Sequence, residues 1–180
     1  VLTVDGAYKA ADFINFCDAY DIPVLSLTNV KGYATDVRSE KSIAKAVAKL
    51  TYAFANANVP KVNVITGEAY GSAYVTMNSK ALGADVTYAW PDASIGMMDA
   101  NEAAKIMYAD DIAKSADVQS VISEKAAEYA ALQSGVESAA ARGYVDTIIN
   151  PEDTRKYVAA AFEMLYTKRE DRPDKKHGTV

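Results

Sequence analysis

The stretch from Lys61 to Tyr74 reads KVNVITGEAYGSAY, and it indicates the fold class. Its first part, Lys61–Thr66, is short, apolar and rich in β-branched side chains, which is typical of a buried strand. A turn of small residues follows and leads into a predicted helix over Gly71–Ala81. A strand that passes into a helix is the repeating unit of α/β domains, so the stretch predicts parallel strands joined by helices.

Strand and helix patterns alternate along the rest of the chain as well. The predicted strands are Val1–Val4, Val24–Thr28, Val86–Ala89, Ser94–Gly96 and Val145–Ile149. The predicted helices are Lys9–Tyr20, Glu40–Ala57 with Ser39 as its N-cap, Asp99–Met107, Ser115–Arg142 with a break near Ser134–Gly135, and Pro151–Lys168. Such alternation implies right-handed crossovers and an α/β domain. Ligands bind such folds where loops leave the strand ends, which here are the loop after Thr28 and the Thr66–Ala73 turn.

Length and composition limit the classes of protein to consider. The chain has 180 residues, half of them apolar, which suits one domain with a sizeable core. Its net charge of -5 argues against nucleic acid as a partner. The single cysteine, Cys17, cannot form an internal disulfide, and no stretch resembles a membrane span or a signal peptide. We therefore expect a cytoplasmic protein, and the predicted strand at Val1 suggests a part of a longer chain.

The Thr66–Tyr74 turn is the most informative place for chemistry. The first backbone N–H groups of a helix lack partners and carry the positive end of the helix dipole. Small side chains would let a ligand oxygen approach these amides, which suits an oxyanion hole or an anion site. The same small residues could instead serve only to pack a helix closely on a sheet, and the pattern alone favours this structural explanation.

Several common kinds of active site are missing from the sequence. It has no phosphate-binding loop of the Gly-x-x-x-x-Gly-Lys type, no strand-linked Gly-x-Gly-x-x-Gly and no Cys/His metal spacing. The only histidine, His177, lies in a charged tail and is expected to be solvated, so a Ser–His pair with Ser72 is not supported. Cys17 lies on an apolar helix face and suits a small core residue. Any chemistry must then use backbone dipoles and a bound cofactor.

Seven segments, taken in order, resemble the carboxyltransferase subunits of biotin-dependent acyl-CoA carboxylases and decarboxylases, within the crotonase superfamily. They are Phe16–Pro23, Val59–Val62, Ala69–Tyr74, Leu82–Asp85, Tyr88–Pro91, Arg142–Asp146, and Lys168–Asp171 with Lys175–Gly178. The resemblance is to the C-terminal of two crotonase-like domains. It implies a ββα-spiral fold for residues 1–180 and an active site shared with an N-terminal domain.

The resemblance also implies the cofactor and the partners. In that family the N-terminal domain holds acyl-CoA, and the C-terminal domain faces biotin on a carrier protein, with no metal. The expected partners are therefore that domain, the biotin carboxyl carrier protein, a biotin carboxylase or a membrane decarboxylase subunit, and further copies in a homo-oligomer.

The family places an oxyanion hole for the biotin ureido oxygen at a Gly-Ala pair, and the matching residues here are Ser72 and Ala73. The backbone amides of this pair are the expected catalytic groups, since replacing Gly by Ser keeps the amide. The residues expected to contact substrate or biotin are Gly71, Tyr70, Val75, Gly32 and Tyr33. Val75 matches a position near the acyl group, and its size suggests a short acyl chain.

Two loops depart from the family pattern and leave alternatives open. The stretch Val30–Glu40 is shortened and lacks the arginine that the family has there, and Met98–Glu102 replaces another pocket loop. The acyl group and the direction of transfer are therefore open, and a decarboxylase that serves a membrane ion pump is the first alternative. A crotonase-like domain kept only for assembly is a second. A hydratase or isomerase is a third, with Glu68 as its only acid beside the hole.

Overall fold

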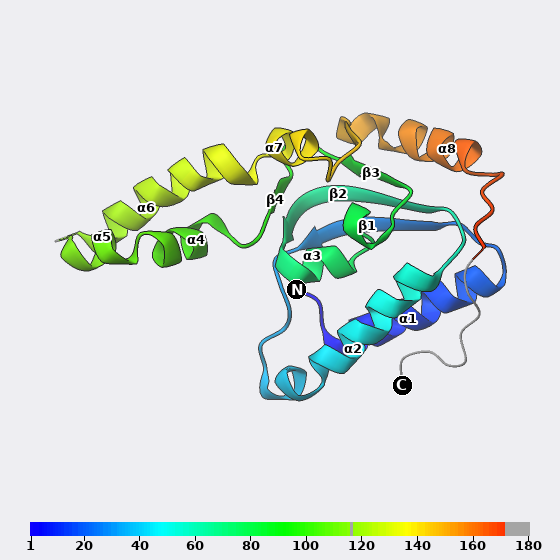
Figure 1. Cartoon of the computed structure of the whole chain (residues 1–180), viewed down its shortest axis with the longest axis horizontal. Coiled ribbons are helices and arrows are strands. Elements are labelled where there is room, and N and C mark those ends of the chain that lie inside the picture. Colours follow the sequence, from blue (N-terminus) through cyan, green and yellow to red (C-terminus); the bar gives the residue numbers. More distant parts are fainter. Residues whose placement is uncertain (116, 172–180) are drawn as a thin grey trace.

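A computed structural model describes residues 1–115 and 117–171, and it confirms the α/β class (Figure 1). Its sheet has five strands, and every described pair is parallel. The main path runs β1 (Val24–Val30), β2 (Lys61–Tyr70), β3 (Val86–Ala89) and β5 (Thr147–Ile148), and β4 (Ser94–Gly96) pairs with β2.

The central strand β2 pairs with β1 along one edge and with two further strands along the other, and α3 follows it without a loop. Its first half pairs with β3 over Val62–Ile65, and its second half pairs with β4 over Glu68–Tyr70. Helix α3 (Gly71–Thr76) begins at the next residue. The carboxyl end of β2 therefore lies where β4 and α3 meet.

Helices cover both faces of the sheet and close two apolar cores. Helices α1 (Val4–Ala19) and α2 (Val37–Asn56) lie side by side under one face (Figure 1). They bury β2 side chains such as Ile65 and Ala69. On the other face, α8 (Thr154–Met164) covers the alternate residues of β2 and β3. This alternation is what a strand buried on both faces requires.

A helical arm projects from the body between β4 and β5 (Figure 1). It consists of α4 (Ala100–Met107), α5 (Ala109–Lys114) and α6 (Val118–Tyr129). The π-helical turn η2 (Ala130–Ser134) and α7 (Val136–Ala141) bring the chain back to the sheet, where Gly135 bridges to Ser94. The predicted break near Ser134–Gly135 is confirmed.

Two predictions at helix starts are wrong. Residues Val1–Val4 do not form a strand, because Thr3 is the N-cap of α1 and its hydroxyl accepts the amide of Gly6. Leu2 forms only an isolated bridge to Tyr33. At α2 the N-cap is Asp36 and not Ser39. The hydroxyl and amide of Ser39, together with a neighbouring amide, donate to the Asp36 carboxylate and lower its pKa.

Other predicted elements are correct in type but too long. The helix predicted from Gly71 ends at Thr76, after which Asn78 adopts a positive φ of 56° and a 3-10 turn, η1, spans Lys80–Leu82. The last strand shrinks to β5, and the closing helix α8 starts after the 3-10 turn η3 (Pro151–Asp153) and ends at Met164. His177 and Lys175–Gly178 lie outside the described residues.

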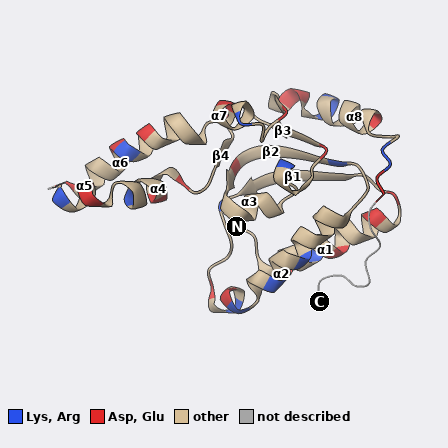
Figure 2. Cartoon of the chain, in the orientation of Figure 1, with Lys and Arg blue, Asp and Glu red and all other residues tan. Residues whose placement is uncertain are grey.

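Charge and hydropathy add two findings. Basic and acidic residues both occur along helices such as α6 and α8 (Figure 2). Within residues 1–115 and 117–171 no helix has the length and apolar character needed to cross a bilayer. The cytoplasmic location and the exclusion of nucleic acid stay predictions.

Candidate functional site

The turn from β2 into α3 depends on Gly71. This residue has φ of +59°, and a side-chain carbon built on it would lie 3.0 Å from the carbonyl oxygen of Met97. Both features favour glycine, which alone adopts this backbone conformation without strain. The tight turn brings the start of α3 close to Met97, the residue that follows β4. The leading amides of α3 belong to the first helical turn, where no intrahelical acceptor exists.

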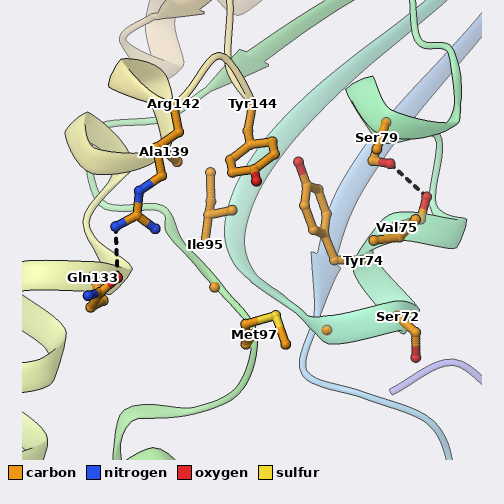
Figure 3. A pocket seen from close by; sticks show the side chains of 13 residues that line it. Ser72, Tyr74, Val75, Ser79, Ile95, Met97, Gln133, Ala139, Arg142 and Tyr144 are labelled. Atoms are coloured by element: carbon orange, nitrogen blue, oxygen red, sulfur yellow. Dashed lines mark hydrogen bonds between the residues drawn. The ribbon is translucent and has the colours of Figure 1, made fainter.

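A pocket of about 440 Å³ opens at this turn. Three parts of the chain form its walls (Figure 3). They are α3 with the turn that follows it, the region of β4, and the stretch that runs from η2 through α7 towards β5. Its lining residues are Gly71, Ser72, Tyr74, Val75, Ser79, Ala81, Ile95, Gly96, Met97, Gln133, Ala139, Arg142 and Tyr144. The pocket thus combines an apolar wall with a small number of polar groups, as small-molecule sites do.

Of the two predicted oxyanion-hole residues, Ser72 lines this pocket, whereas Ala73 is not among the lining residues. Ser72 is exposed, and its hydroxyl points away from the side chains of Tyr74 and Val75 (Figure 3). Ala73 is 2% exposed and its methyl group packs in the main core. Only the backbone of Ala73 is therefore available for chemistry, which agrees with a hole made of amides. Val75 is 40% exposed and lines the pocket.

Three predicted contact residues lie elsewhere. Tyr70 is buried, and its hydroxyl donates to Ser94 Oγ at 2.8 Å, a structural contact between β2 and β4. Gly32 and Tyr33 are not among the residues that line the pocket. The Gly32 carbonyl accepts the amide of Leu2 at 2.9 Å, so this loop ties down the start of the chain. The predicted Thr66–Ala73 turn is mostly the end of strand β2, and only Gly71 and Ser72 of this range line the pocket. The loop after Thr28 contributes no residue to the pocket lining.

Sequence reasoning missed Tyr74 as a pocket residue. Its side chain is 7% exposed and points towards Tyr144 (Figure 3). The buried hydroxyl of Tyr74 has no hydrogen-bond partner among the described residues. Burial, and secondarily the nearby Tyr144, raise the pKa of Tyr74 to about 12. The phenol therefore stays protonated at neutral pH and can donate a hydrogen bond.

The opposite wall brings together residues that are distant in sequence from α3. Arg142 at the C-cap of α7 donates to the side-chain oxygen of Gln133, which belongs to η2, at 2.7 Å (Figure 3). Gly143 has φ of +81°, so the chain turns sharply before Tyr144. In the sequence, the segment Arg142–Asp146 is notable only for its resemblance to the family. That resemblance is the sequence feature that could have located this wall of the pocket.

Glu68, the acid beside the predicted hole, lies outside the pocket lining and forms an ion pair. Its carboxylate pairs with Lys31 Nζ at 3.0 Å, and this contact raises the pKa of Lys31. Glu68 is also absent from the lining residues. In the part of the chain that the structure describes, no group of three or more His, Cys, Asp or Glu side chains could hold a metal ion.

Comparisons with known proteins match this chain along its whole length. The family profile described as "Carboxyl transferase domain" matches residues 1–180. A Bacillus subtilis (strain 168) protein, provisionally named a propionyl-CoA carboxylase beta chain, is 50% identical over 99% of this chain and 36% of its own length. A methylmalonyl-CoA decarboxylase subunit alpha from Propionigenium modestum is 43% identical over 99% of this chain and 35% of its own length.

A solved structure agrees with the same fold. The crystal structure of transcarboxylase 12S, a hexamer with methylmalonyl-coenzyme A and methylmalonic acid bound, has a TM-score of 0.93 at 43% identity. The match covers 98% of this chain and 34% of that one. The chain thus spans about a third of the length of the relatives it matches.

Proposed function

This chain belongs to the carboxyl transferase domain family, and we propose that it is the biotin-facing, C-terminal domain of an acyl-CoA carboxyltransferase. The observation that carries the proposal is the mostly apolar pocket at the start of α3, which Gly71 and Ser72 line, and the proposed role of the Ser72 and Ala73 amides is to face a ligand there. The proposed reaction moves a carboxyl group between biotin and the α-carbon of a short-chain acyl-CoA.

The proposed partners follow from the length of the relatives. Because the chain corresponds to about a third of each, we propose an N-terminal domain that holds acyl-CoA and completes the site. We further propose a biotin carboxyl carrier protein, a biotin carboxylase and a homo-oligomer in the cytoplasm. The transcarboxylase relative is a hexamer, which supports the oligomer.

The pocket residues fit biotin. Ile95 and Met97 offer apolar surface to its fused rings, and Tyr74 lines the same cavity. Biotin on its carrier supplies the position that gives up or receives the carboxyl group. Within residues 1–115 and 117–171, no residue that lines the pocket is a carboxylate, a histidine or a lysine. The chain's own residues are therefore left to bind, orient and stabilise charge.

The amides of Ser72 and Ala73 carry the electrostatic part of the proposal. Negative charge that develops on a ligand oxygen is stabilised by N–H groups that already point at it, because they need not reorient during the reaction. Loss of one such donor costs on the order of 3 kcal/mol of transition-state stabilisation. The helix start fixes both amides, and the buried methyl group of Ala73 anchors them to the core.

A decarboxylase is the second candidate, since a methylmalonyl-CoA decarboxylase subunit is 43% identical to this chain. It would use the same pocket in the opposite direction and pass the carboxyl group to a membrane partner. A hydratase or isomerase has less support, because Glu68 is paired with Lys31 outside the pocket lining.

The test uses the complete enzyme, meaning this chain together with the proposed N-terminal domain. Transfer of a labelled carboxyl group from a carboxylated biotin carrier to propionyl-CoA is expected, and this chain alone should show none. Absence of transfer by the folded complete enzyme, in both directions, would refute the proposed function.

Two variants examine the amide hole itself. Ser72→Gly keeps the amide and removes an exposed hydroxyl that points away from Tyr74 and Val75, so most activity should remain. Ala73→Val adds two methyl groups to a fully packed core position, which costs about 1–3 kcal/mol. It should lower both stability and transfer. A folded Ser72→Gly enzyme without activity would instead assign the chemistry to the hydroxyl.

A further inference from the structure

One pocket residue carries a charge that nothing in the pocket balances. Among the described residues that line the pocket, Arg142 alone is ionised at neutral pH. Its guanidinium donates to Gln133, a neutral amide, and no described carboxylate pairs with it. A guanidinium has five N–H donors in a planar fork, so most remain available after this one bond. An unpaired fork at the rim of a pocket suits an incoming carboxylate.

A second polar group lies deeper in the same cavity. Tyr74 is more than nine-tenths buried, and its hydroxyl has no partner among the described residues. A buried hydroxyl without a partner is less favourable than one that donates a hydrogen bond. The hydroxyl is covered in this structure, so a ligand oxygen would accept its hydrogen bond only after a local shift of the side chains around it. The phenol remains a neutral donor because burial raises the pKa of Tyr74.

We propose that Arg142 binds the carboxylate of a carboxylated ligand at the rim of the pocket, while Tyr74 donates to a second, uncharged oxygen of the same ligand inside it. The proposal rests on the proposed function. It adds residues that distinguish a ligand that carries the carboxyl group from one that does not. That group could be on the acyl-CoA or on the biotin of the carrier, and Arg142 would recognise it by the same chemistry.

Gln133 is a positioning residue in this arrangement. It belongs to the π-helical turn η2, and π-turns often occur at functional sites. Its side-chain oxygen holds the Arg142 guanidinium at 2.7 Å without neutralising its charge. A carboxylate at this position would fix the arginine equally well but would compete with the ligand.

The experiment compares ligands that differ by one carboxylate, on the complete enzyme. In the first arm, calorimetry gives the Kd of methylmalonyl-CoA and of propionyl-CoA. In the second arm, steady-state rates give the KM of the carboxylated biotin carrier protein and the inhibition constant of the uncarboxylated carrier. The variants are Arg142→Gln, Arg142→Lys, Gln133→Glu and Tyr74→Phe, with folding checked by thermal unfolding.

Arg142→Gln should reduce the preference for the carboxylated member about tenfold in one arm, because a hydrogen-bonded charge contact of about 1.4 kcal/mol is lost. The arm that responds identifies which molecule carries the carboxylate. Arg142→Lys should keep part of the preference, and Gln133→Glu should weaken it. Tyr74→Phe should weaken the binding of the carboxylated and the uncarboxylated ligand equally.

Unchanged preferences in both arms for a folded Arg142→Gln enzyme would overturn the inference. So would an equal loss for carboxylated and uncarboxylated ligands, since that result would assign Arg142 a packing role. The proposed function stands or falls separately, because it depends on carboxyl transfer by the wild-type enzyme and not on these ratios.

Discussion

The carbonyl oxygen of Met97 lies 3.0 Å from the point where Gly71 would carry a side-chain carbon. Gly71 also has φ of +59°, so the end of β2 can turn into α3 beside β4 only with glycine at this position. Two separate constraints, backbone conformation and close approach, therefore coincide at the residue that precedes the proposed amide hole.

Gly71→Ala should lower both stability and carboxyl transfer. The left-handed backbone alone costs about 1–2 kcal/mol for a residue with a side chain, and the contact with the Met97 carbonyl adds to it. Gly83→Ala is the matched control, because Gly83 also has a positive φ of 105° but the nearest atom to the added carbon is 3.9 Å away. Urea unfolding of both variants measures the difference, and equal losses would contradict the contact argument.

Asp85 joins two segments that are far apart in sequence. Its carboxylate accepts the amide of Lys61 at 2.8 Å and the ammonium of Lys168 at 2.9 Å, and both charged side chains are less than one-fifth exposed. Asp85→Ala should destabilise the fold by about 2 kcal/mol, because charge-assisted hydrogen bonds with little exposure are lost. Chemical denaturation of the variant gives the value.

The control for this prediction is Asp12→Ala. Asp12 pairs with Lys49 at 3.0 Å, but its side chain is 67% exposed, so the loss should stay below about 1 kcal/mol. If the two variants were destabilised equally, the stabilising role assigned to the Asp85 contacts would be wrong.

Much of the fold could be predicted because its strands are short, apolar and separated by helix patterns. The segments that carried the family resemblance are largely structural. Asp18 accepts the amides of Asn58 and Val59, and Asp146 pairs with Lys80 and accepts the amide of Thr87. Trp90 donates to Thr154. These contacts fix loops and termini, so the motifs identify the fold more directly than the chemistry.

The candidate site was harder to predict because it is assembled from distant parts of the chain. The Ser72–Ala73 turn and Val75 could be located from the strand-to-helix pattern. The sequence does not predict that Tyr74 and Arg142 line the same pocket, because Arg142 reaches the pocket only through the return of the chain along η2 and α7. The error at Val1–Val4 has a simpler cause, because apolar residues around Thr3 resemble a strand until Thr3 is recognised as an N-cap.

Val75→Asp should change which acyl-CoA the complete enzyme prefers. Val75 lines the pocket and is 40% exposed, so the charge is tolerated by the fold but alters the apolar wall. Differences of one methylene in such a wall change specificity by about 1–3 kcal/mol. The ratio of kcat/KM for acetyl-CoA and propionyl-CoA should therefore shift about tenfold. Val118→Asp, on the exposed arm and 44% exposed, should leave the ratio unchanged.

Tyr74→Phe should stabilise the ligand-free protein while it weakens ligand binding. The variant removes a buried hydroxyl without a described partner, which should raise the free energy of unfolding by about 1 kcal/mol at neutral pH. Tyr144→Phe is the control, since that side chain is 46% exposed and its removal should change stability little. A binding role predicts this opposition between stability and affinity, and a packing role does not.

The same variant should change the stability of the protein at high pH. The pKa of Tyr74 is raised to about 12 in the folded state, above the ordinary tyrosine value of about 10, so folding favours the protonated phenol. Its contribution is complete below about pH 10 and is lost as the pH rises towards 12, because the unfolded chain ionises first. Other groups titrate in this range too, so the wild-type curve must be compared with that of Tyr74→Phe. The wild-type protein should lose about 2 kcal/mol more than the variant between pH 9 and 12. Parallel curves would show that the Tyr74 hydroxyl is solvated in the folded protein, and the donor assigned to the pocket would have to be sought elsewhere.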